Sequence, residues 1–211
     1  MYRLYVAPGT AAMAPQAVLE EIGLAYEAIP INIGAKQHLS DEYRRLNPPG
    51  RVPTLVDGDF VMFEAAAISL WLAEKHSSAG LMPAPGTHER ARTLQWLTHL
   101  TNTVQEAFIE FYHPDWYVEG AEAQTAFKIG AERRLEELWS RLDAGLAAHG
   151  PYLSGASFSV ADIYLHMLNR WSRNCSRAAW TWPNIKRNVD LVRVRPAVQR
   201  MMAKQSIAEP Y

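Results

Sequence analysis

The sequence from residue 46 to residue 73 reads LNPPGRVPTLVDGDFVMFEAAAISLWLA, and it decides how the first part of the chain folds. Two short apolar runs, Thr54–Val56 and Phe60–Phe63, flank an Asp-Gly-Asp segment. Because Asp-Gly between strand-forming residues favours a tight turn, these runs predict a β-hairpin. Val52 and Pro53 stand directly before the first run. A cis peptide is expected between them, since only X–Pro bonds adopt the cis form at low cost.

A helix follows the hairpin, and its N-terminus stands beside a carboxylate. Glu64 comes directly after the second run, and apolar residues at helical spacing begin at Ala65. The free N–H groups and the positive dipole end of a helix N-terminus attract an anion, whereas Glu64 attracts an ammonium group. The peptide at Val52 can pair through its N–H and C=O with an extended peptide. A short peptide with a zwitterionic amino-acid head, such as glutathione, fits these groups; a purely structural unit with an acidic first helical turn is the alternative.

Outside this stretch, strand-like and helix-like patterns alternate up to residue 76. Strands are expected at 3–6 and 26–33, helices at 12–23 and, exposed to solvent, at 40–46, followed by the hairpin and a helix at 64–76. This order predicts a mixed sheet with helices on both sides. Beyond a segment rich in Pro, Gly and Ser, only helical patterns occur, with long ones at 89–113 and 121–149. We therefore predict an α/β domain at 1–76, a linker at 77–87 and an all-α domain at 88–211.

The composition is that of an ordinary globular protein. The chain has 211 residues, a net charge of −1 and 48% hydrophobic residues, so no excess of positive charge indicates nucleic acid or an anionic membrane as a partner. No apolar run approaches the ~18 residues that span a bilayer. The N-terminal MYRLYVAPGTAAMAP lacks the apolar core of a signal peptide, and the one cysteine, Cys175, suits a reducing compartment, so a cytoplasmic location is expected. The seven histidines show no ligand spacing, and no metal is expected.

A capping box is predicted in the helical part of the chain. Ser159 and Asp162 have the S-x-x-D spacing directly before an apolar run. A catalytic acid at Asp162 is disfavoured, because the capping role accounts for the spacing and such caps contribute about 1 kcal/mol.

Together these motifs resemble a known family. The order N-P-x-G-x-V-P-x-L, D-G and E-x-x-A-I-x-x-W-L is similar to that of the thioredoxin-like domain of the glutathione transferases. The N-terminal YRLY, the Pro8-Gly9 pair and the Ala14-Pro15 pair resemble the bacterial beta-class branch, and FSVADI at residues 158–163 resembles the family's capping motif. The resemblance covers nearly the whole chain. It implies a thioredoxin-like α/β domain followed by an all-α domain, in a cytosolic homodimer.

The resemblance also implies a binding site for glutathione as co-substrate. Val52 would pair with the cysteinyl part, Glu64 and the Ala65 N–H would hold the γ-glutamyl head, and Gln37 would lie near the glycine end. Many family members carry Ser where this chain has Ala65, whose missing hydroxyl would weaken binding by about 1 kcal/mol. The full set of expected glutathione-binding residues is Gln37, Arg51, Val52, Pro53, Glu64 and Ala65. For Arg51, plain solvent exposure is the alternative.

The catalytic side chains of the beta-class branch are missing. Its cysteine falls on Ala11, and two of its histidines fall on Gln16 and Gln105. A thiol of pKa ~8.5 needs a donor or positive field to become a thiolate at neutral pH. The remaining candidates are the Thr10 hydroxyl, which is the first choice, the Tyr5 hydroxyl, the N–H groups of Ala11 and Ala12, and the Gln105 side chain. A turn-capping role for Thr10 and a core position for Tyr5 are the alternatives.

The second substrate of a transferase of this kind would lie between the domains. Phe108, Tyr112 and Trp116 offer an aromatic lining for an apolar electrophile, although Phe108 and Tyr112 also have the spacing of ordinary core residues. The predicted function is thus conjugation of the glutathione thiolate to an apolar electrophile, as in detoxification, or a related thiol-dependent reduction. The identity of the electrophile does not follow from the sequence.

Two other functions stay open at this point. A non-catalytic protein that uses the same fold for protein interaction or ligand binding is favoured by the lost catalytic groups at Ala11, Gln16 and Gln105. The Val52-Pro53 pair and Glu64 count against it, since a scaffold has less need of them. Disulfide exchange through a protein cysteine is disfavoured, because no cysteine lies near the predicted site in the sequence.

Overall fold

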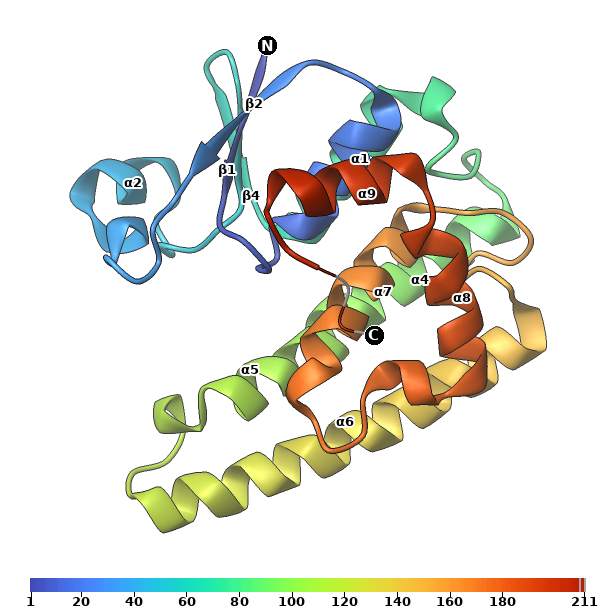
Figure 1. Cartoon of the computed structure of the whole chain (residues 1–211). Helices are drawn as coiled ribbons and strands as arrows, with labels where there is room; N and C mark the ends of the chain where they lie inside the picture. Colours follow the sequence, from blue (N-terminus) through green and yellow to red (C-terminus); the bar gives the residue numbers. More distant parts are fainter. Residues whose placement is uncertain (209, 211) are drawn as a thin grey trace. The chain divides into compact units, whose positions relative to one another are not determined.

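The computed structural model describes residues 1–208 and 210, and it divides into two compact units (Figure 1). Unit 1 contains Met1–Met82 together with the C-terminal segment from Arg193 on, and unit 2 contains Pro83–Val192. An α/β part followed by a mostly helical part is what the sequence predicts, and this is confirmed. The finer domain boundaries expected at residues 76 and 88 stay a prediction.

Unit 1 is built on a four-stranded mixed sheet with the order β2-β1-β3-β4. The strands are β1 (Tyr2–Val6), β2 (Tyr26–Pro30), β3 (Thr54–Asp57) and β4 (Phe60–Phe63). β1 pairs with β2 in parallel and with β3 antiparallel, and β3 and β4 form the predicted hairpin. Gly58 in the hairpin turn has φ 60°, a conformation that a glycine adopts without steric cost.

The helices of unit 1 cover this sheet (Figure 1). They are α1 (Met13–Ile22), α2 (Asp41–Leu46), α3 (Ala65–Lys75) and α9 (Pro196–Lys204), with short 3₁₀ helices η1 (Gln37–Leu39) and η2 (Ser77–Ala79). On β1, Leu4 is fully buried and its neighbour Arg3 is exposed, as the alternation of a strand requires. Residues 40–46, expected to be exposed, form α2, but the side chain of Tyr43 on it is buried.

The C-terminal helix α9 is tied to α1 by ion pairs. The Arg195 guanidinium contacts Glu21 at 2.5 Å, and Glu20 accepts hydrogen bonds from Arg200 at 2.9 Å and from Lys204 at 2.5 Å. Glu20 is largely buried, and a buried carboxylate is usually paired with cationic side chains, which compensate for the lost hydration of its charge. These contacts account for the membership of the C-terminal segment in unit 1.

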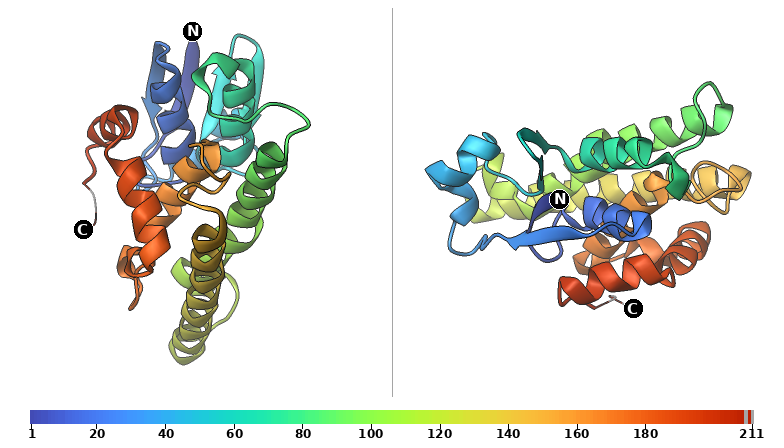
Figure 2. Two further views of the ribbon diagram at one scale, coloured as in Figure 1. Left: turned by 90° about the vertical axis from the view of Figure 1, so that its right-hand side faces the viewer. Right: turned by 90° about the horizontal axis from the view of Figure 1, so that it is seen from above.

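Unit 2 is helical. Its helices are α4 (His88–His99), α5 (Glu106–Tyr112), α6 (Ala121–His149), α7 (Val160–Trp171) and α8 (Pro183–Arg193), with 3₁₀ helices η4 (Pro114–Trp116), η5 (Ser172–Asn174) and η6 (Ala179–Thr181). The long helix expected at 89–113 is interrupted by a π-helical segment, η3 (Leu100–Gln105). There the Thr101 hydroxyl donates to the carbonyl of Leu97 and lies 2.9 Å from that of Thr98, a type of contact that bends helices. Figure 2 shows the length of α6 beside α4 and α5.

The predicted capping box at the start of α7 is confirmed. The Asp162 carboxylate is fully buried and accepts hydrogen bonds from the N–H groups of Ser159 and Leu153, both at 2.8 Å, and from the side chain of Asn188 at 2.8 Å. Burial raises the pKa of Asp162 to about 6, while these donors oppose the rise. The residue is therefore a structural carboxylate of the core of unit 2.

Within residues 1–208 and 210, none of the helices combines the length and the apolar character that a membrane-spanning helix needs. In the same part of the chain, no three His, Cys, Asp or Glu side chains lie together in a way that could hold a metal ion.

Candidate functional site

One end of the sheet in unit 1 gathers all the predicted glutathione-binding segments. Tyr5 pairs with Thr54, Thr54 pairs with Phe63, and Val6 pairs with Pro30. The residues after β1, before β3, after β4 and after β2 therefore leave the sheet at the same end. The strand register thus brings the turn at Gly9, the Val52 peptide and Glu64 to one edge, although they lie far apart in the sequence.

The turn after β1 uses a glycine for its shape. Residues 7–10 form a turn with Pro8 second and Gly9 third, Gly9 has φ 71°, and the Thr10 N–H donates to the Ala7 carbonyl at 3.4 Å. This is the pattern of a type II turn, whose third residue requires positive φ. The Thr10 hydroxyl donates to the same carbonyl at 2.7 Å and accepts from the Ala12 N–H at 3.3 Å. Its one proton is therefore engaged, and a role as donor to sulfur stays a prediction.

The backbone at Ala11 offers a donor directly after this turn. In the described part of the chain, no acceptor contacts the Ala11 N–H, whereas the Ala12 and Met13 N–H groups both bond back to Thr10. Ala12 is the N-cap of α1 and provides no side-chain cap. The Ala11 N–H therefore lies at an open helix N-terminus, where the helix dipole favours a negative charge.

Tyr5 lies on the face of the sheet opposite to Leu4. Its half-buried ring meets the ring of Tyr43 edge to face, with centroids 5.6 Å apart. The side chain belongs to the packing between β1 and α2, and its catalytic role stays a prediction.

Two buried polar side chains bind the backbone directly before Val52. The Val52–Pro53 peptide is cis, as the sequence predicts. The Arg51 carbonyl accepts a hydrogen bond from the Tyr43 hydroxyl at 2.7 Å and another from the Asn47 amide, also at 2.7 Å. Both donors also lie within hydrogen-bond distance of the Thr54 hydroxyl, at 2.8 and 3.0 Å. Burial raises the pKa of Tyr43, so its hydroxyl keeps the proton that it donates.

We call Tyr43 and Asn47, with their hydrogen bonds to the Arg51 carbonyl, the clamp. The clamp does not use the peptide groups of Val52. Among the residues that the structure describes, neither the N–H nor the C=O of Val52 has a hydrogen-bond partner. An extended peptide can therefore pair with Val52 without breaking a bond of the protein. The sequence analysis missed the roles of Tyr43 and Asn47; the Asn directly before Pro-Pro-Gly was their available signal.

Glu64 has a strained backbone. It is a non-glycine residue with φ 72° and ψ 109°, and strain of this kind concentrates at functional sites. Glu64 is the N-cap residue of α3, its exposed side chain does not cap the helix, and Ala65 begins the first turn. An open helix N-terminus and a free carboxylate therefore lie together at the end of β4, close to Val52 by the strand register.

Gln37 lies in the loop that follows β2. Its side-chain oxygen accepts the Asn32 N–H at 2.9 Å, so the loop fixes the orientation of this exposed amide. Contacts of Gln37, Arg51 and Pro53 with a ligand stay predictions.

The aromatic residues predicted to hold a second substrate all belong to unit 2. Phe108 is 0% exposed and packs against the rings of Tyr112, Trp139 and Trp171. The Tyr112 hydroxyl donates to the Trp171 carbonyl at 2.5 Å. Trp116 is 55% exposed and its ring stacks on His113 at 4.2 Å. Phe108 is therefore a core residue. A substrate-binding role for these three residues stays a prediction.

Comparison with known proteins points in one direction. Residues 1–74 match the family described as the N-terminal domain of glutathione S-transferase. The chain is 29% identical to the disulfide-bond oxidoreductase YfcG of Escherichia coli over 99% of this chain and 98% of the relative. A solved glutathione transferase from Methylococcus capsulatus is 33% identical, with a TM-score of 0.84 over 98% of this chain and 99% of that one. A sphingomonad glutathione S-transferase solved in complex with glutathione is 28% identical, with a TM-score of 0.82 over 98% and 100%.

Proposed function

The chain belongs to the glutathione transferase family, and from this premise we propose that it binds reduced glutathione in unit 1 and conjugates the glutathione thiolate to an apolar electrophile. The observation that carries the proposal is the open Val52 peptide beside the exposed Glu64. The backbone of the cysteinyl residue pairs with Val52, Glu64 accepts the γ-glutamyl ammonium group, and the N–H groups at the start of α3 receive the γ-glutamyl carboxylate.

The sulfur of glutathione lies at the N-terminus of α1 in this proposal. The Ala11 N–H and the helix dipole stabilise the thiolate, which lowers the pKa of the thiol, and the proton passes to water. The thiolate then attacks the electrophilic carbon. A carbon–sulfur bond forms as the bond to the leaving group breaks, and the leaving group departs with the bonding electrons. The Thr10 hydroxyl is a second candidate donor to the sulfur. It ranks behind the Ala11 N–H, because it would first have to break its hydrogen bond to the Ala7 carbonyl.

The same proposal includes the binding of an apolar electrophile by the aromatic side chains of Phe108, Tyr112 and Trp116. The family resemblance supports a cytoplasmic homodimer with a role in detoxification.

A second candidate reaction is the reduction of a disulfide by bound glutathione, which the similarity to the Escherichia coli oxidoreductase favours. The bound thiolate would attack one sulfur of a disulfide, form a mixed disulfide with glutathione and release the other sulfur as a thiolate. Cys175 takes no part, because burial and Glu132 raise its pKa to about 12, so that its thiol stays protonated at neutral pH. A second glutathione thiol would resolve the mixed disulfide.

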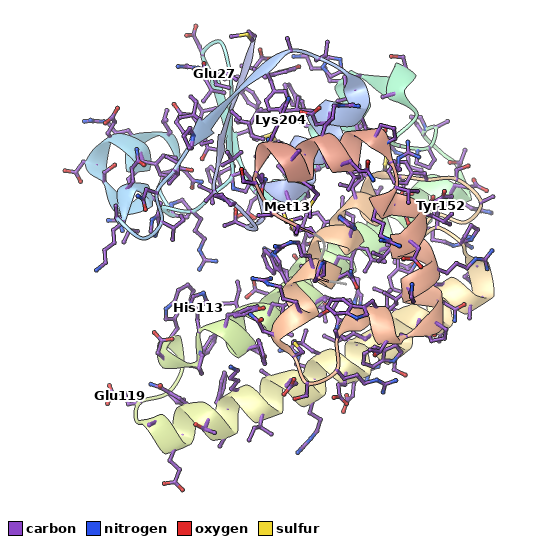
Figure 3. All side chains as sticks on the ribbon, viewed as in Figure 1. Met13, Glu27, His113, Glu119, Tyr152 and Lys204 are labelled. Carbon is purple, nitrogen blue, oxygen red and sulfur yellow. The ribbon has the colours of Figure 1, made fainter. Side chains whose placement is uncertain are left out.

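Calorimetric titration of the purified protein with reduced glutathione tests the proposal. We expect binding in the micromolar to low millimolar range. Replacing Glu64 by Ala removes a hydrogen bond to a charged group and should cost about 1.5–3 kcal/mol, roughly a ten- to hundredfold loss of affinity. Glu27→Ala is the matched control, since this exposed residue on β2 is the strand-register partner of Arg3 on β1, toward the other end of the sheet (Figure 3).

The outcomes separate the alternatives. Absence of heat and of a thermal shift at ~10 mM glutathione would favour the non-catalytic protein. Equal affinities of the wild-type protein and the Glu64→Ala variant would exclude the bound orientation described above. With binding established, turnover of an electrophile or of a disulfide decides between the two reactions.

A further inference from the structure

The turn beside the proposed sulfur site is held by a residue from the far end of the chain. In a type II turn the N–H of the third residue takes no part in the turn's own hydrogen bond. Here that N–H belongs to Gly9, and it donates to the side-chain oxygen of Gln205 at 2.9 Å. Gln205 is the C-cap residue of α9 and is 4% exposed. The contact joins residues 196 positions apart, both within unit 1.

Gln205 is the first member of a longer chain of hydrogen bonds. Its amide nitrogen donates to the side-chain oxygen of Gln16 at 2.7 Å. The amide nitrogen of Gln16 lies 3.1 Å from the hydroxyl of Tyr26, which donates to the Glu20 carboxylate at 2.6 Å. Every donor therefore points the same way, from the Gly9 N–H toward Glu20. Hydrogen bonds in such a chain polarise and strengthen one another.

Tyr26 fixes the direction of this chain. Burial and the hydrogen bond to Glu20 raise the pKa of Tyr26 well above its ordinary value, so its hydroxyl keeps the proton and donates it to the carboxylate. The hydroxyl oxygen then accepts from the Gln16 nitrogen, which turns the Gln16 oxygen toward Gln205. The Gln205 nitrogen must face Gln16, and its oxygen is left for Gly9. The oxygen and nitrogen of a side-chain amide are hard to tell apart by themselves, and here the network determines which is which in both Gln16 and Gln205.

The carboxylate at the end of the chain is itself anchored. Glu20 accepts from Lys204 at 2.5 Å and from Arg200 at 2.9 Å, both on α9. Figure 3 labels Lys204 on α9 and Met13 at the start of α1. These ion pairs fix the Glu20 carboxylate, at the end of the network away from Gly9.

We propose that Gln205 is a positioning residue for the sulfur site: by holding the Gly9 N–H it fixes the turn that directs the Ala11 N–H toward the thiolate of bound glutathione. The inference rests on the proposed function. Gly9 and Ala11 are separated by Thr10 alone, so a rotation of the turn that frees Gly9 also reorients the Ala11 N–H. The residue that ends α9 thereby helps to position the sulfur site.

The pKa of bound glutathione is the readout that separates positioning from general stabilisation. Gln205→Met keeps the volume of the side chain and removes its hydrogen bonds. It should raise the pKa of the bound thiol by about half to one unit, measured from the ultraviolet absorbance of the thiolate during a pH titration at saturating glutathione. At a pH below the pKa of the bound thiol, where the thiol is protonated in both proteins, the affinity for glutathione should change less than twofold, because the Val52 and Glu64 contacts are untouched.

Arg200→Met is the matched control. It removes the contacts of Arg200 with the side chain and the carbonyl of Glu20 and so weakens the packing of α9 on α1, but it leaves the Gly9–Gln205 bond in place. Its bound glutathione should keep the wild-type pKa. Gln205→Leu removes the same hydrogen bonds and replaces Gln205→Met as the test if that variant does not fold.

Each result has one meaning. An unchanged pKa in Gln205→Met, or an equal rise in Arg200→Met, would overturn the positioning role. Failure of the wild-type protein to bind glutathione at all would instead overturn the proposed function, and calorimetry of the wild-type protein shows this before any variant is compared.

Discussion

The clamp below the Val52 peptide gives the sharpest test of the proposed binding site. Asn47 is 2% exposed, and its amide donates to the Arg51 carbonyl at 2.7 Å and to the Thr54 hydroxyl at 3.0 Å. Asn47→Ala removes both bonds. At roughly 0.5–1.5 kcal/mol for each net hydrogen bond, with a further contribution from the space left behind, the free energy of unfolding should fall by about 2–3 kcal/mol.

Tyr43→Phe should cost less. It removes only the hydroxyl, while Asn47 continues to serve the Arg51 carbonyl, so about 1 kcal/mol is expected. Because the two side chains share their acceptors, the double variant should lose more than the sum of the single losses: only in that variant are both of these donors to the Arg51 carbonyl absent. Urea denaturation followed by circular dichroism measures all of these values. Tyr117→Phe, at an exposed hydroxyl in unit 2, should change stability by less than about 0.5 kcal/mol.

The same variants connect stability to binding. If the clamp fixes the Val52 peptide, Asn47→Ala should also weaken glutathione binding by about tenfold at a temperature where the variant is still fully folded. A stable, folded Asn47→Ala protein with wild-type affinity would refute the reasoning, because the open peptide would then not depend on its support. Strictly additive losses in the double variant would refute the sharing of acceptors.

Further predictions concern stability. Gly50 has φ 63°, and a Cβ there would lie 2.9 Å from the His38 carbonyl oxygen, so Gly50→Ala should lower the free energy of unfolding by about 2 kcal/mol or more; a loss below about 0.5 kcal/mol in urea denaturation would contradict this. Asp162, with a pKa of about 6 in the folded chain against 3.8 for the free residue, contributes stability that is fully present below pH 3.8 and is lost as the pH rises through 6, about 3 kcal/mol in all. Unfolding measured from about pH 3 to pH 7 should therefore show that the wild-type protein loses this amount relative to Asp162→Asn, and parallel profiles would contradict the raised pKa.

Local signals in the sequence predict much of this fold. The Asp-Gly turn lies between two β-forming runs, and Val52-Pro53 forms a cis peptide, because a few adjacent residues determine each of these conformations. Glu64 and Ala65 are expected at a helix start for the same reason, and α3 begins at Ala65. Where the determinant is local, the prediction and the structure agree.

Features that depend on distant residues are those the sequence analysis missed. The burial of Tyr43 follows from its contacts with Tyr5 and with the Arg51 carbonyl, and the charge pattern of its own helix indicates exposure. The docking of α9 on α1 joins Glu20 and Glu21 to arginines more than 170 positions away. No periodicity within either helix encodes that pairing.

The proposed site consists largely of backbone groups: the Ala11 N–H, the Val52 peptide and the first turn of α3. A backbone donor needs no particular side chain, so alanine at positions 11 and 65 is compatible with binding and with thiolate stabilisation. What a backbone site needs is a fixed conformation. That requirement falls on residues that do not touch the ligand: Gln205 for the turn at Gly9, and Tyr43 and Asn47 for the Arg51 carbonyl. If the proposed site is correct, substitutions of these supporting residues should separate active from inactive proteins.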